Sequence, residues 1–242
     1  MSKEPFIDIF EETYKKLGKE IKEEIRNEIR RIILADKKTK ESNEAKKYYN
    51  IKSFQDATKE EIRNYLYLYD NAEINLLDYW KVGDIRYEEC GVTYIIANTV
   101  YCNVRTYITI LRLDLIDTCL WMNPSNSLVR DFEFKNSIVD KFLKDNADWI
   151  LGNTFKNIAY KNSLSIPTAT EVFGEGYYYN SIKDGYQFEY FKDKNNRNLN
   201  GNWWTRTCNS TSLAEFAYCN ENGEIRWSLA NKACGLVPCF KI

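Results

Sequence analysis

The segment from Gly201 to Ile242 constrains the fold most, because it has the pattern of a β-hairpin followed by a proline-containing close. Asn222-Gly223 marks the turn, since both residues tolerate the positive φ that a type I′ turn demands. Apolar and polar residues alternate on both sides of this turn, which predicts a hairpin with one buried face. The alternating apolar residues are Phe216, Tyr218, Ile225, Trp227 and Leu229.

Two further features of this segment predict how it packs. Trp203-Trp204 offers more apolar area than any other dipeptide of the chain, and each indole N–H will need an acceptor if it is buried. Pro238 has no N–H to donate to a β-ladder, so we expect it at a strand edge or at the first position of a strand.

Composition sets broad limits on the class of protein. A chain of 242 residues with 44% hydrophobic residues can form one large domain or two small ones around a sizeable core. The net charge of −1 argues against a general nucleic-acid binder, which needs a surplus of basic residues. No apolar run reaches the roughly 20 residues that span a bilayer, and no signal peptide is evident. We therefore expect the protein to be made and kept in a cytoplasm, or to leave it by lysis.

The chain contains no histidine, which removes the usual general base and the Ser-His and Cys-His nucleophilic pairs. It also removes most zinc chemistry. None of the seven cysteines forms a C-x-x-C pair. Free buried thiols are favoured over a disulfide framework. Acidic residues are numerous, but nothing selects a glycosidase-type carboxylate pair. We predict no catalytic residue, no metal and no cofactor.

The N-terminal third is predicted to be helical. Residues 6–34 carry one apolar stripe at a mean spacing close to 3.6 residues, and Glu–Lys pairs cover the opposite face. This helix can pack on the rest of the protein or form a homo-oligomeric bundle, and the sequence leaves both open. Residues 36–50 resemble a linker. Thr58-Lys59-Glu60-Glu61 is a capping box that starts a second helix, expected to continue to about Asp78.

Near Trp80 the pattern changes from helical to strand and turn, so we place a domain boundary there: 1–79 for attachment or oligomerisation, and 80–242 for the second domain. Residues 92–97 and 104–113 are expected strands, although the second could be a buried helix. A turn is expected at 123–127 and a helix from Asn136 to Ile150, with Ile138, Phe142, Leu143 and Trp149 as its stripe.

Further along, residues 158–161 are expected to form a short strand, and Thr168 to Glu171 to cap a turn of helix. An aromatic cluster follows: Tyr177, Tyr178, Tyr179, Tyr186, Phe188, Tyr190 and Phe191. It either pads loops against the core or offers faces for a sugar or a protein. Residues 192–202 are polar and are expected to form a surface loop.

The order of several short motifs resembles a family of domains encoded by phages and prophages of low-GC Gram-positive bacteria. Members close with Trp-Trp-x-Arg-Ser, a glycine-containing hairpin and Gly-Val-Arg-Pro-x-Phe. The matching positions are Trp203, Trp204, Arg206, Gly223, Gly235, Pro238 and Phe240, with Met122 to Asn126, Ile166-Pro167 and Glu171 to Gly174 upstream. Thr207 and Val237 depart from the pattern, where the family has Ser and Arg.

The resemblance implies an α+β chain: an N-terminal helical region, then a C-type-lectin-like domain with a small twisted antiparallel sheet, two helices and long loops. Formylglycine-generating enzymes share that fold and use a cysteine-centred copper site. The motif around that site is missing here, so their activity is not carried over. Calcium-dependent sugar binding would need a Glu-Pro-Asn type loop, which the terminal segment lacks.

In the variable proteins of diversity-generating retroelements, which share this fold, exposed residues of the last strands contact the ligand. By position, the corresponding residues here are Asn209, Thr211, Ser212, Glu215, Asn220, Glu224, Arg226 and Ser228. Small polar side chains suit adaptable hydrogen bonding. Arg206 is expected to be a buried structural arginine that donates to backbone carbonyls.

The sequence therefore predicts a non-catalytic phage- or prophage-derived binding protein, carried on a virion or tail and recognising a host-surface protein or glycan. Homo-oligomerisation would run through residues 6–34, with no nucleic-acid partner and no membrane span. The alternative is an intracellular module that binds a host or defence protein during infection.

Overall fold

A computed structural model describes residues 49–89, 91–102, 105–122, 134–135, 137–160, 162–174, 185–209 and 215–242. The chain forms two compact units. The first comprises Met1–Asn50 with Tyr67–Asn75, and the second Ile51–Leu66 with Leu76–Ile242. In the first unit the Tyr49 hydroxyl donates to the Glu73 carboxylate at 3.0 Å. The expected helix at 6–34, the turn at 123–127 and Tyr177 to Tyr179 lie outside the described residues.

The capping box at Thr58 is confirmed. α3 (Lys59–Asp70) begins directly after Thr58, whose backbone N–H donates to Glu61 Oε2 at 2.8 Å. In return, the Glu61 N–H donates to Thr58 Oγ1 at 3.2 Å. The helix is shorter than expected, because it ends at Asp70 instead of near Asp78. Ala72 has a left-handed φ of 60°, and a separate 3-10 turn, η1 (Leu76–Asp78), follows.

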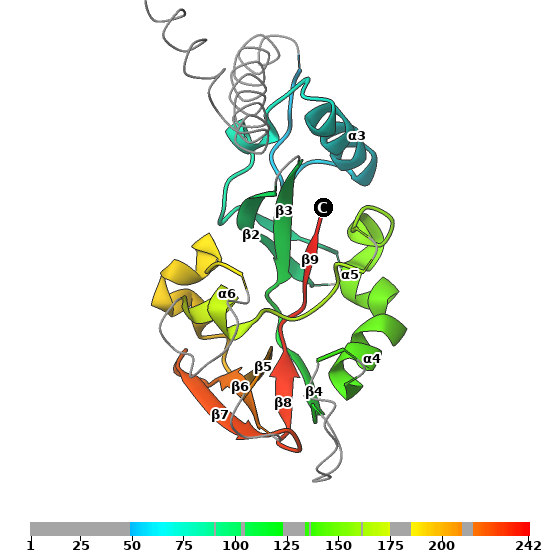
Figure 1. Ribbon diagram of the computed structural model, residues 1–242. Coiled ribbons are helices and arrows are strands. Elements are labelled where there is room, and N and C mark those ends of the chain that lie inside the picture. Colours follow the sequence, from blue (N-terminus) through cyan, green and yellow to red (C-terminus); the bar gives the residue numbers. More distant parts are fainter. Residues whose placement is uncertain are drawn as a thin grey trace, which may run out of the picture. The chain divides into compact units, whose positions relative to one another are not determined.

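The second unit is a mixed α+β structure with two sheets (Figure 1). The first has the order β1 (Ile85–Tyr87), β2 (Thr93–Cys102), β3 (Arg105–Arg112), β9 (Cys239–Lys241). The second has the order β4 (Ile116–Leu120), β8 (Cys234–Leu236), β5 (Trp203–Cys208), β6 (Glu215–Cys219), β7 (Ile225–Leu229). The expectation of one antiparallel sheet was wrong, because there are two and β5 runs parallel to β8.

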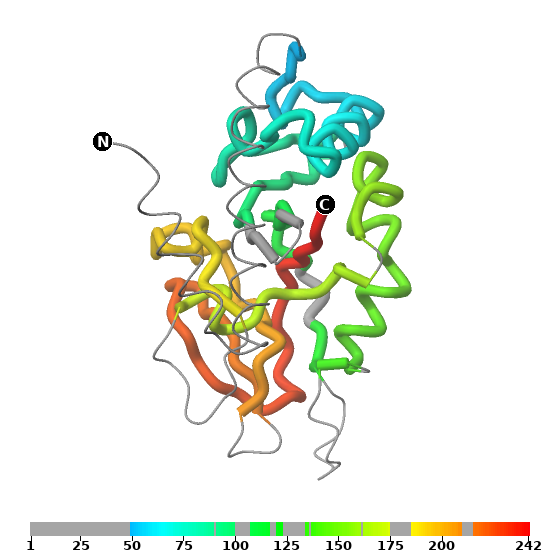
Figure 2. The backbone as a smooth tube through the Cα atoms, turned by 45° about the horizontal axis from the view of Figure 1, so that its top comes forward, coloured from blue at the N-terminus to red at the C-terminus, as the bar shows by residue number. Residues whose placement is uncertain are grey.

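One antiparallel ribbon joins the two sheets. β3 is followed by β4 and β8 by β9, and each pair of consecutive strands lies beside the other pair, as Figures 1 and 2 show. Pro238 lies where the ribbon changes sheet, immediately before β9. Its carbonyl accepts from the Arg112 N–H at 2.9 Å. Because Pro238 precedes β9, its missing N–H leaves no gap within that strand.

The segment 104–113 is a strand, β3, which settles the choice between strand and buried helix. Ile108 and Ile110 project to one face of the sheet and Leu111 to the other, and all three are fully buried. Helices cover both faces: α5 (Ala147–Phe155) lies on one side and α6 (Ala169–Phe173) on the other (Figure 1). A strand buried on both faces has a nearly continuous apolar sequence, which explains the ambiguity.

The helix expected from Asn136 to Ile150 is two helices. α4 (Ile138–Asp145) ends at Asn146, and α5 continues past Gly152 to Phe155. Trp149 was expected in the buried stripe, but it is 52% exposed, with the Arg112 guanidinium 4.4 Å from its ring centroid. The capping box at Thr168 is confirmed, with Glu171 as its second member at the start of α6.

Two other local expectations were wrong. No strand forms over the described residues of 158–161, where the chain turns after α5. The segment 192–202 is not a plain surface loop, because η2 (Glu189–Lys192) and η3 (Lys194–Arg197) occupy much of it. Arg197 is buried and donates through Nε and Nη2 to the Phe191 carbonyl at 3.0 and 2.8 Å.

The two adjacent tryptophans belong to different cores. Trp203 packs in a cluster with Phe191 and the α6 residues, and Trp204 packs with Phe216 and the α4 residues. Successive strand residues point to opposite faces, so this dipeptide links both layers. Both are fully buried, and each indole has its acceptor: Trp203 Nε1 donates to the Arg197 carbonyl at 3.3 Å, and Trp204 Nε1 to the Leu120 carbonyl at 2.9 Å.

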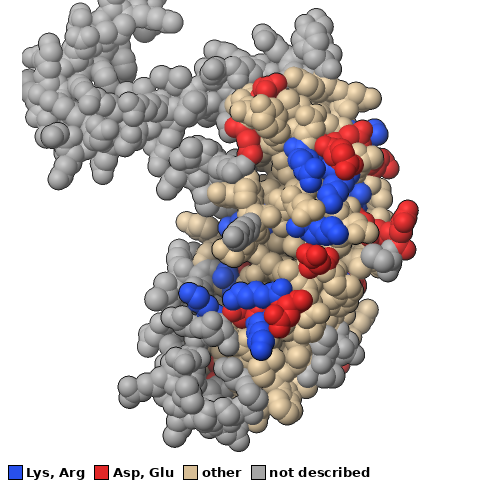
Figure 3. All heavy atoms as spheres, turned by 90° about the vertical axis from the view of Figure 1, so that its right-hand side faces the viewer, with Lys and Arg blue, Asp and Glu red and all other residues tan. Residues whose placement is uncertain are grey.

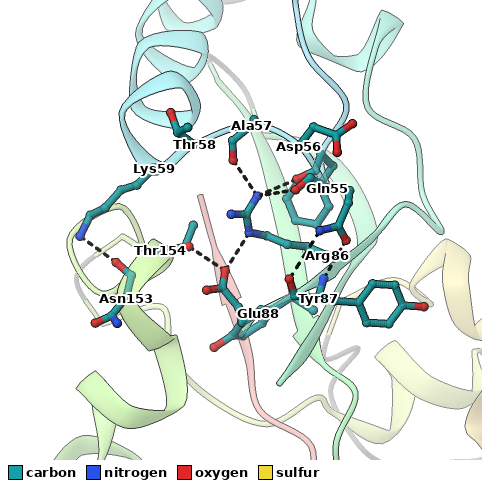
Figure 4. A network of polar contacts seen from close by, with 12 residues as sticks. Gln55, Asp56, Ala57, Thr58, Lys59, Arg86, Tyr87, Glu88, Asn153 and Thr154 are labelled. Atoms are coloured by element: carbon teal, nitrogen blue, oxygen red, sulfur yellow. Dashed lines mark hydrogen bonds and ion pairs between the residues drawn. The ribbon is translucent and has the colours of Figure 1, made fainter. Parts of the chain in front are cut away.

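Within the second unit, Arg86 on β1 holds residues 54–57 against the first sheet (Figure 4). Its Nη1 donates to the carbonyl oxygens of Phe54, Gln55 and Ala57 at 2.9, 3.2 and 2.7 Å. Its Nε donates to Glu88, which also accepts from the Thr154 hydroxyl at 2.6 Å. Segment 51–66, assigned by sequence to the N-terminal domain, is therefore part of the unit that holds the sheets.

Candidate functional site

The hairpin at Asn222-Gly223 is confirmed, but its turn differs from the expected type I′. Only Gly223 has a positive φ, at 74°; Asn222 does not. The Gly223 N–H donates to the Asn220 carbonyl at 2.9 Å, and Asn220 Oδ1 accepts from the N–H groups of Asn222 and Glu224 at 3.0 and 2.8 Å. Because the Asn220 side chain organises the loop, only one residue has to be left-handed.

The structure divides the predicted ligand-binding residues between two faces. Arg226 lies opposite Tyr218 and Ser228 opposite Phe216, so both project to the Trp204 side of the sheet. Glu215 lies opposite Leu229, on the other side, and accepts from Asn209 Nδ2 at 2.9 Å. Thr211 and Ser212 lie outside the described residues.

The remaining two predicted residues belong to the turn and are occupied locally. Asn220 shapes the loop, and Glu224 accepts from Arg226 Nη2 at 2.7 Å. Over its described residues, the hairpin therefore offers no single polar face of the expected composition. Ligand contact by these residues stays a prediction.

A groove of about 1200 Å³ lies elsewhere in the second unit. Its walls come from β3, α4, α5, residues 159–160 and 162–165, α6, β5 and β9. Aromatic side chains in these walls include Tyr107 and Tyr160, whose rings meet edge to face at 5.1 Å. A cavity of this size suits a ligand of several rings or residues.

Five cationic side chains and two anionic ones line the groove: Lys135, Lys144, Lys156, Arg206 and Lys241 against Asp140 and Glu171. Lys144 pairs with Asp140 at 2.6 Å, and Arg206 Nη2 approaches both Glu171 oxygens at 3.3 and 3.4 Å. Among the described residues, no carboxylate pairs with Lys156 or Lys241. The groove therefore carries a local positive surplus.

This surplus is local and does not extend over the molecule. Figure 3 shows the side of the protein that carries α4 and α5, and there basic and acidic side chains are interspersed over the described surface. A broad single-sign field would attract polyanions from a distance, whereas the groove can act only on a ligand that enters it.

Glu171 joins α6 to the groove. Its Oε2 accepts from the Thr168 N–H at 2.7 Å in the capping box, and its side chain is 15% exposed. Burial raises the pKa of this carboxyl, and the neighbouring Arg206 guanidinium partly opposes the shift. Arg206 was expected to donate to backbone carbonyls. It is instead 37% exposed and paired with a carboxylate; Arg86 and Arg197 have the role expected of it.

Two of the described thiols are not poised for nucleophilic chemistry. Cys219 and Cys239 are free and buried. Burial raises the pKa of Cys219 to about 12. Burial, and then the Glu171 carboxylate, also raises the pKa of Cys239, against smaller opposing effects of Arg206 and Lys241.

Two polar atoms in the groove walls are buried without a hydrogen-bond partner among the described residues. They are Thr109 Oγ1 on β3 and Arg206 Nε on β5. Thr109 is 3% exposed and lies directly opposite Lys241 on the neighbouring strand β9. An unpartnered buried donor is costly, so such atoms mark a place where a ligand can complete the structure.

Tyr160 and residues 162–165 cover one edge of β9. The Tyr160 N–H donates to the Lys241 carbonyl at 2.9 Å, and Ser165 and Cys239 exchange backbone hydrogen bonds at 2.9 and 2.8 Å. The Lys241 N–H donates to Ser163 Oγ at 3.1 Å. Since these groups are occupied, a peptide cannot join the sheet here as an extra strand, and recognition must use side chains.

Sequence reasoning had named four residues that line the groove, for other reasons: Glu171, Phe188, Arg206 and Phe240. Glu171 was identified as a capping residue and Arg206 as part of a terminal motif. Nothing in the local sequence connected them to Thr109 or Lys241, because the register of β3 with β9 brings these together across more than a hundred residues. Among the described residues, no group of three or more Cys, Asp or Glu side chains is arranged to hold a metal. In the same residues, no helix has the length and apolarity needed to span a membrane.

Comparison with known families gives one match. Residues 161–242 are similar to a family described as a domain of unknown function, DUF6273. This stretch contains α6, β5 to β9, Glu171, Arg206 and Lys241, but not α4, α5 or Thr109. No curated protein and no solved structure matches the chain.

Proposed function

We propose that this chain is a ligand-binding protein of phage or prophage origin, carried on a virion or tail, that recognises a host-surface glycan or protein. The ligand enters the groove between the β3–β9 strand pair and α4, α5 and α6. The observation that carries this proposal is the groove itself, a cavity of about 1200 Å³ with aromatic, hydroxyl and cationic side chains in its walls. The C-type-lectin-like assignment of residues 80–242 is part of the same proposal.

Binding is favoured over catalysis by the condition of the groove's reactive groups. The Cys239 thiol is buried with a raised pKa, so little of it is thiolate near neutral pH. Glu171 is tied to the Thr168 N–H and to Arg206, an arrangement that holds α6 in place. Neither group is free to move a proton or attack a substrate.

Of the two ligand classes, the groove favours the glycan. The covered edge of β9 removes the backbone pairing on which many peptide sites depend. Tyrosine rings such as Tyr107 and Tyr160 give rigid apolar area against which sugar rings can pack. The alternative, an intracellular module that occupies a host or defence protein, predicts a partner in the cytoplasm.

The test uses full-length labelled protein and intact cells of low-GC Gram-positive bacteria, with purified cell-wall glycans in parallel. Ala147, a half-buried groove residue at the start of α5, is changed to tryptophan to fill the cavity. We expect Ala147→Trp to remove binding and Lys141→Trp, at an exposed position of α4 outside the groove, to retain it. Equal binding by both variants would contradict the groove as the site. A cytoplasmic partner with no cell binding would favour the alternative.

A further inference from the structure

We propose that the part of the groove between Thr109, Arg206 and Lys241 is a subsite for an anionic group, a carboxylate or a phosphate, of the bound ligand. This inference rests on the proposed function, because it concerns the same groove. It adds the chemical class of the ligand: a saccharide that carries an acidic substituent.

The three residues come from three strands that the fold brings together. Thr109 on β3 and Lys241 on β9 are directly opposed, so their side chains share one face of the first sheet. Arg206 comes from β5 of the second sheet, and its Nη2 lies 3.3 Å from Glu171 Oε1. Cys239, two residues before Lys241 on the same face, also lines the groove.

Two buried hydrogen-bond donors of this subsite have no acceptor among the described residues. The Thr109 hydroxyl, in a side chain that is 3% exposed, has no partner among the described residues, and neither has the buried Arg206 Nε–H. Nearby hydroxyls are occupied: Ser163 Oγ donates to the Tyr160 carbonyl at 2.7 Å, and Ser165 Oγ to the Ile166 carbonyl at 3.2 Å. The Thr109 hydroxyl and the Arg206 Nε–H are thus unused donors, and Arg206 and Lys241 are positively charged. An oxyanion needs both hydrogen-bond donors and positive charge.

The charges favour an anion over a neutral group. Glu171 offsets one positive charge through Arg206, at distances that are long for a charged hydrogen bond. Lys241 remains, with its Nζ 5.4 Å from the centroid of the Tyr107 ring and no carboxylate partner among the described residues. Arg206 and Lys241 are positive and Glu171 is negative, so the net charge of these three groups is +1. The subsite therefore attracts an anion and not a cation.

The experiment is calorimetric titration of the full chain at low ionic strength, separately with sodium glucuronate, inorganic phosphate and glucose. We expect glucuronate or phosphate to bind and glucose to bind at least about tenfold more weakly, since one charged hydrogen bond is worth about that factor. Binding of glucuronate alone assigns a carboxylate, and of phosphate alone a phosphate.

The decisive variant is Thr109→Val, which keeps the side-chain shape and removes only the hydroxyl. We expect its Kd for the anion to rise about tenfold, while its Tm without ligand stays equal or rises, because an unsatisfied buried hydroxyl has been removed. Lys241→Gln should weaken binding similarly. Lys192→Gln is the matched control: its cation is exposed on η2 and outside the groove, and its affinity should not change.

Unchanged anion affinity in Thr109→Val and Lys241→Gln, or no binding of either anion, would overturn the subsite. Two outcomes distinguish failure of the anionic subsite from failure of the proposed function. If glucose and glucuronate bind equally and Ala147→Trp removes both, the groove is a binding site without an anionic subsite. If an anion binds through Thr109 but does not compete with cell binding, the subsite stands and the proposed function fails.

Discussion

At the scale of single residues, several side chains have roles that depend on partners far away in the sequence. Arg206 is an example. The sequence predicted a buried arginine on carbonyl oxygens, whereas its partner is Glu171, thirty-five residues earlier. The burial of both tryptophans and an acceptor for each indole could be predicted, because these follow from the side chain alone. Which carboxylate meets which arginine depends on tertiary pairing.

Glu171 also gives a prediction about pH. Its folded-state pKa is raised above the ordinary value of 4.5, so the folded protein holds a proton that the unfolded chain releases. The corresponding contribution to stability is fully present below about pH 4.5 and declines as the pH rises through the folded-state pKa. Glutamine keeps the capping box but cannot ionise. We therefore expect the stability of the wild type, relative to Glu171→Gln, to fall as the pH rises above about 4.5.

Urea unfolding at half-unit pH steps measures this difference. Glu189→Gln, at an exposed position on η2, serves as the control for the loss of a carboxylate outside the groove. Parallel stability curves for wild type and Glu171→Gln would show that the buried carboxyl is not linked to folding in this range.

At the scale of elements, local signals predicted the beginnings of helices better than their ends. Thr58 and Thr168 were identified correctly because a capping box needs only residues three apart. The break at Asn146 was missed, since the apolar pattern runs through it. The turn at Asn222-Gly223 was located correctly but given the wrong type, because the Asn220 side chain supplies bonds that a two-residue turn does not use.

Gly152 in α5 provides the prediction at this scale. Its φ and ψ are 62° and −176°, a conformation open almost only to glycine. A Cβ here would lie 2.9 Å from the Tyr94 hydroxyl, which donates to the Ile150 carbonyl at 2.8 Å. We expect Gly152→Ala to lower the free energy of unfolding by about 3 kcal/mol, from backbone strain and this collision together.

The matched control is Gly91→Ala. Gly91 also has a positive φ, but a Cβ there meets nothing within 4 Å. Its cost should be near 1 kcal/mol, from backbone strain alone. Equal midpoints of urea unfolding for the two variants would mean that the Tyr94 side chain moves away from the new Cβ without lowering the free energy of unfolding.

At the scale of the whole molecule, pattern predicted individual helices and strands and the family resemblance implied the α+β class, but the division of the strands between two sheets could not be predicted. Two sheets arise because the β3–β4 and β8–β9 segments change sheet together, near residues 113–115 and 237–238. The pattern of apolar residues in these two segments does not indicate that the chain passes from one sheet to the other. The sequence pattern does change from helical to strand and turn near Trp80, where the boundary was predicted. However, the hydrogen bond from Arg86 to the Phe54 carbonyl connects the earlier segment 51–66 to the later strands.

Shortening the chain tests this organisation. A chain of residues 50–242 keeps Phe54 and Ile62, whereas one of residues 80–242 loses both and leaves Arg86 without its three carbonyl acceptors. Each buried side chain contributes about 1.5–3 kcal/mol, so we expect the shorter chain to lack cooperative thermal unfolding. Circular dichroism compares the two. A sharp transition from the 80–242 chain would place the true boundary at Trp80.

The ribbon that unites the sheets also sets an order of events during synthesis. β3 and β4 leave the ribosome early, but their partners β9 and β8 follow only after more than a hundred further residues. Until then, both strands present open edges on the nascent chain, where they can pair with the wrong strand. Translation must therefore reach residues 234–241 before either sheet can close, and the groove forms only at that last step.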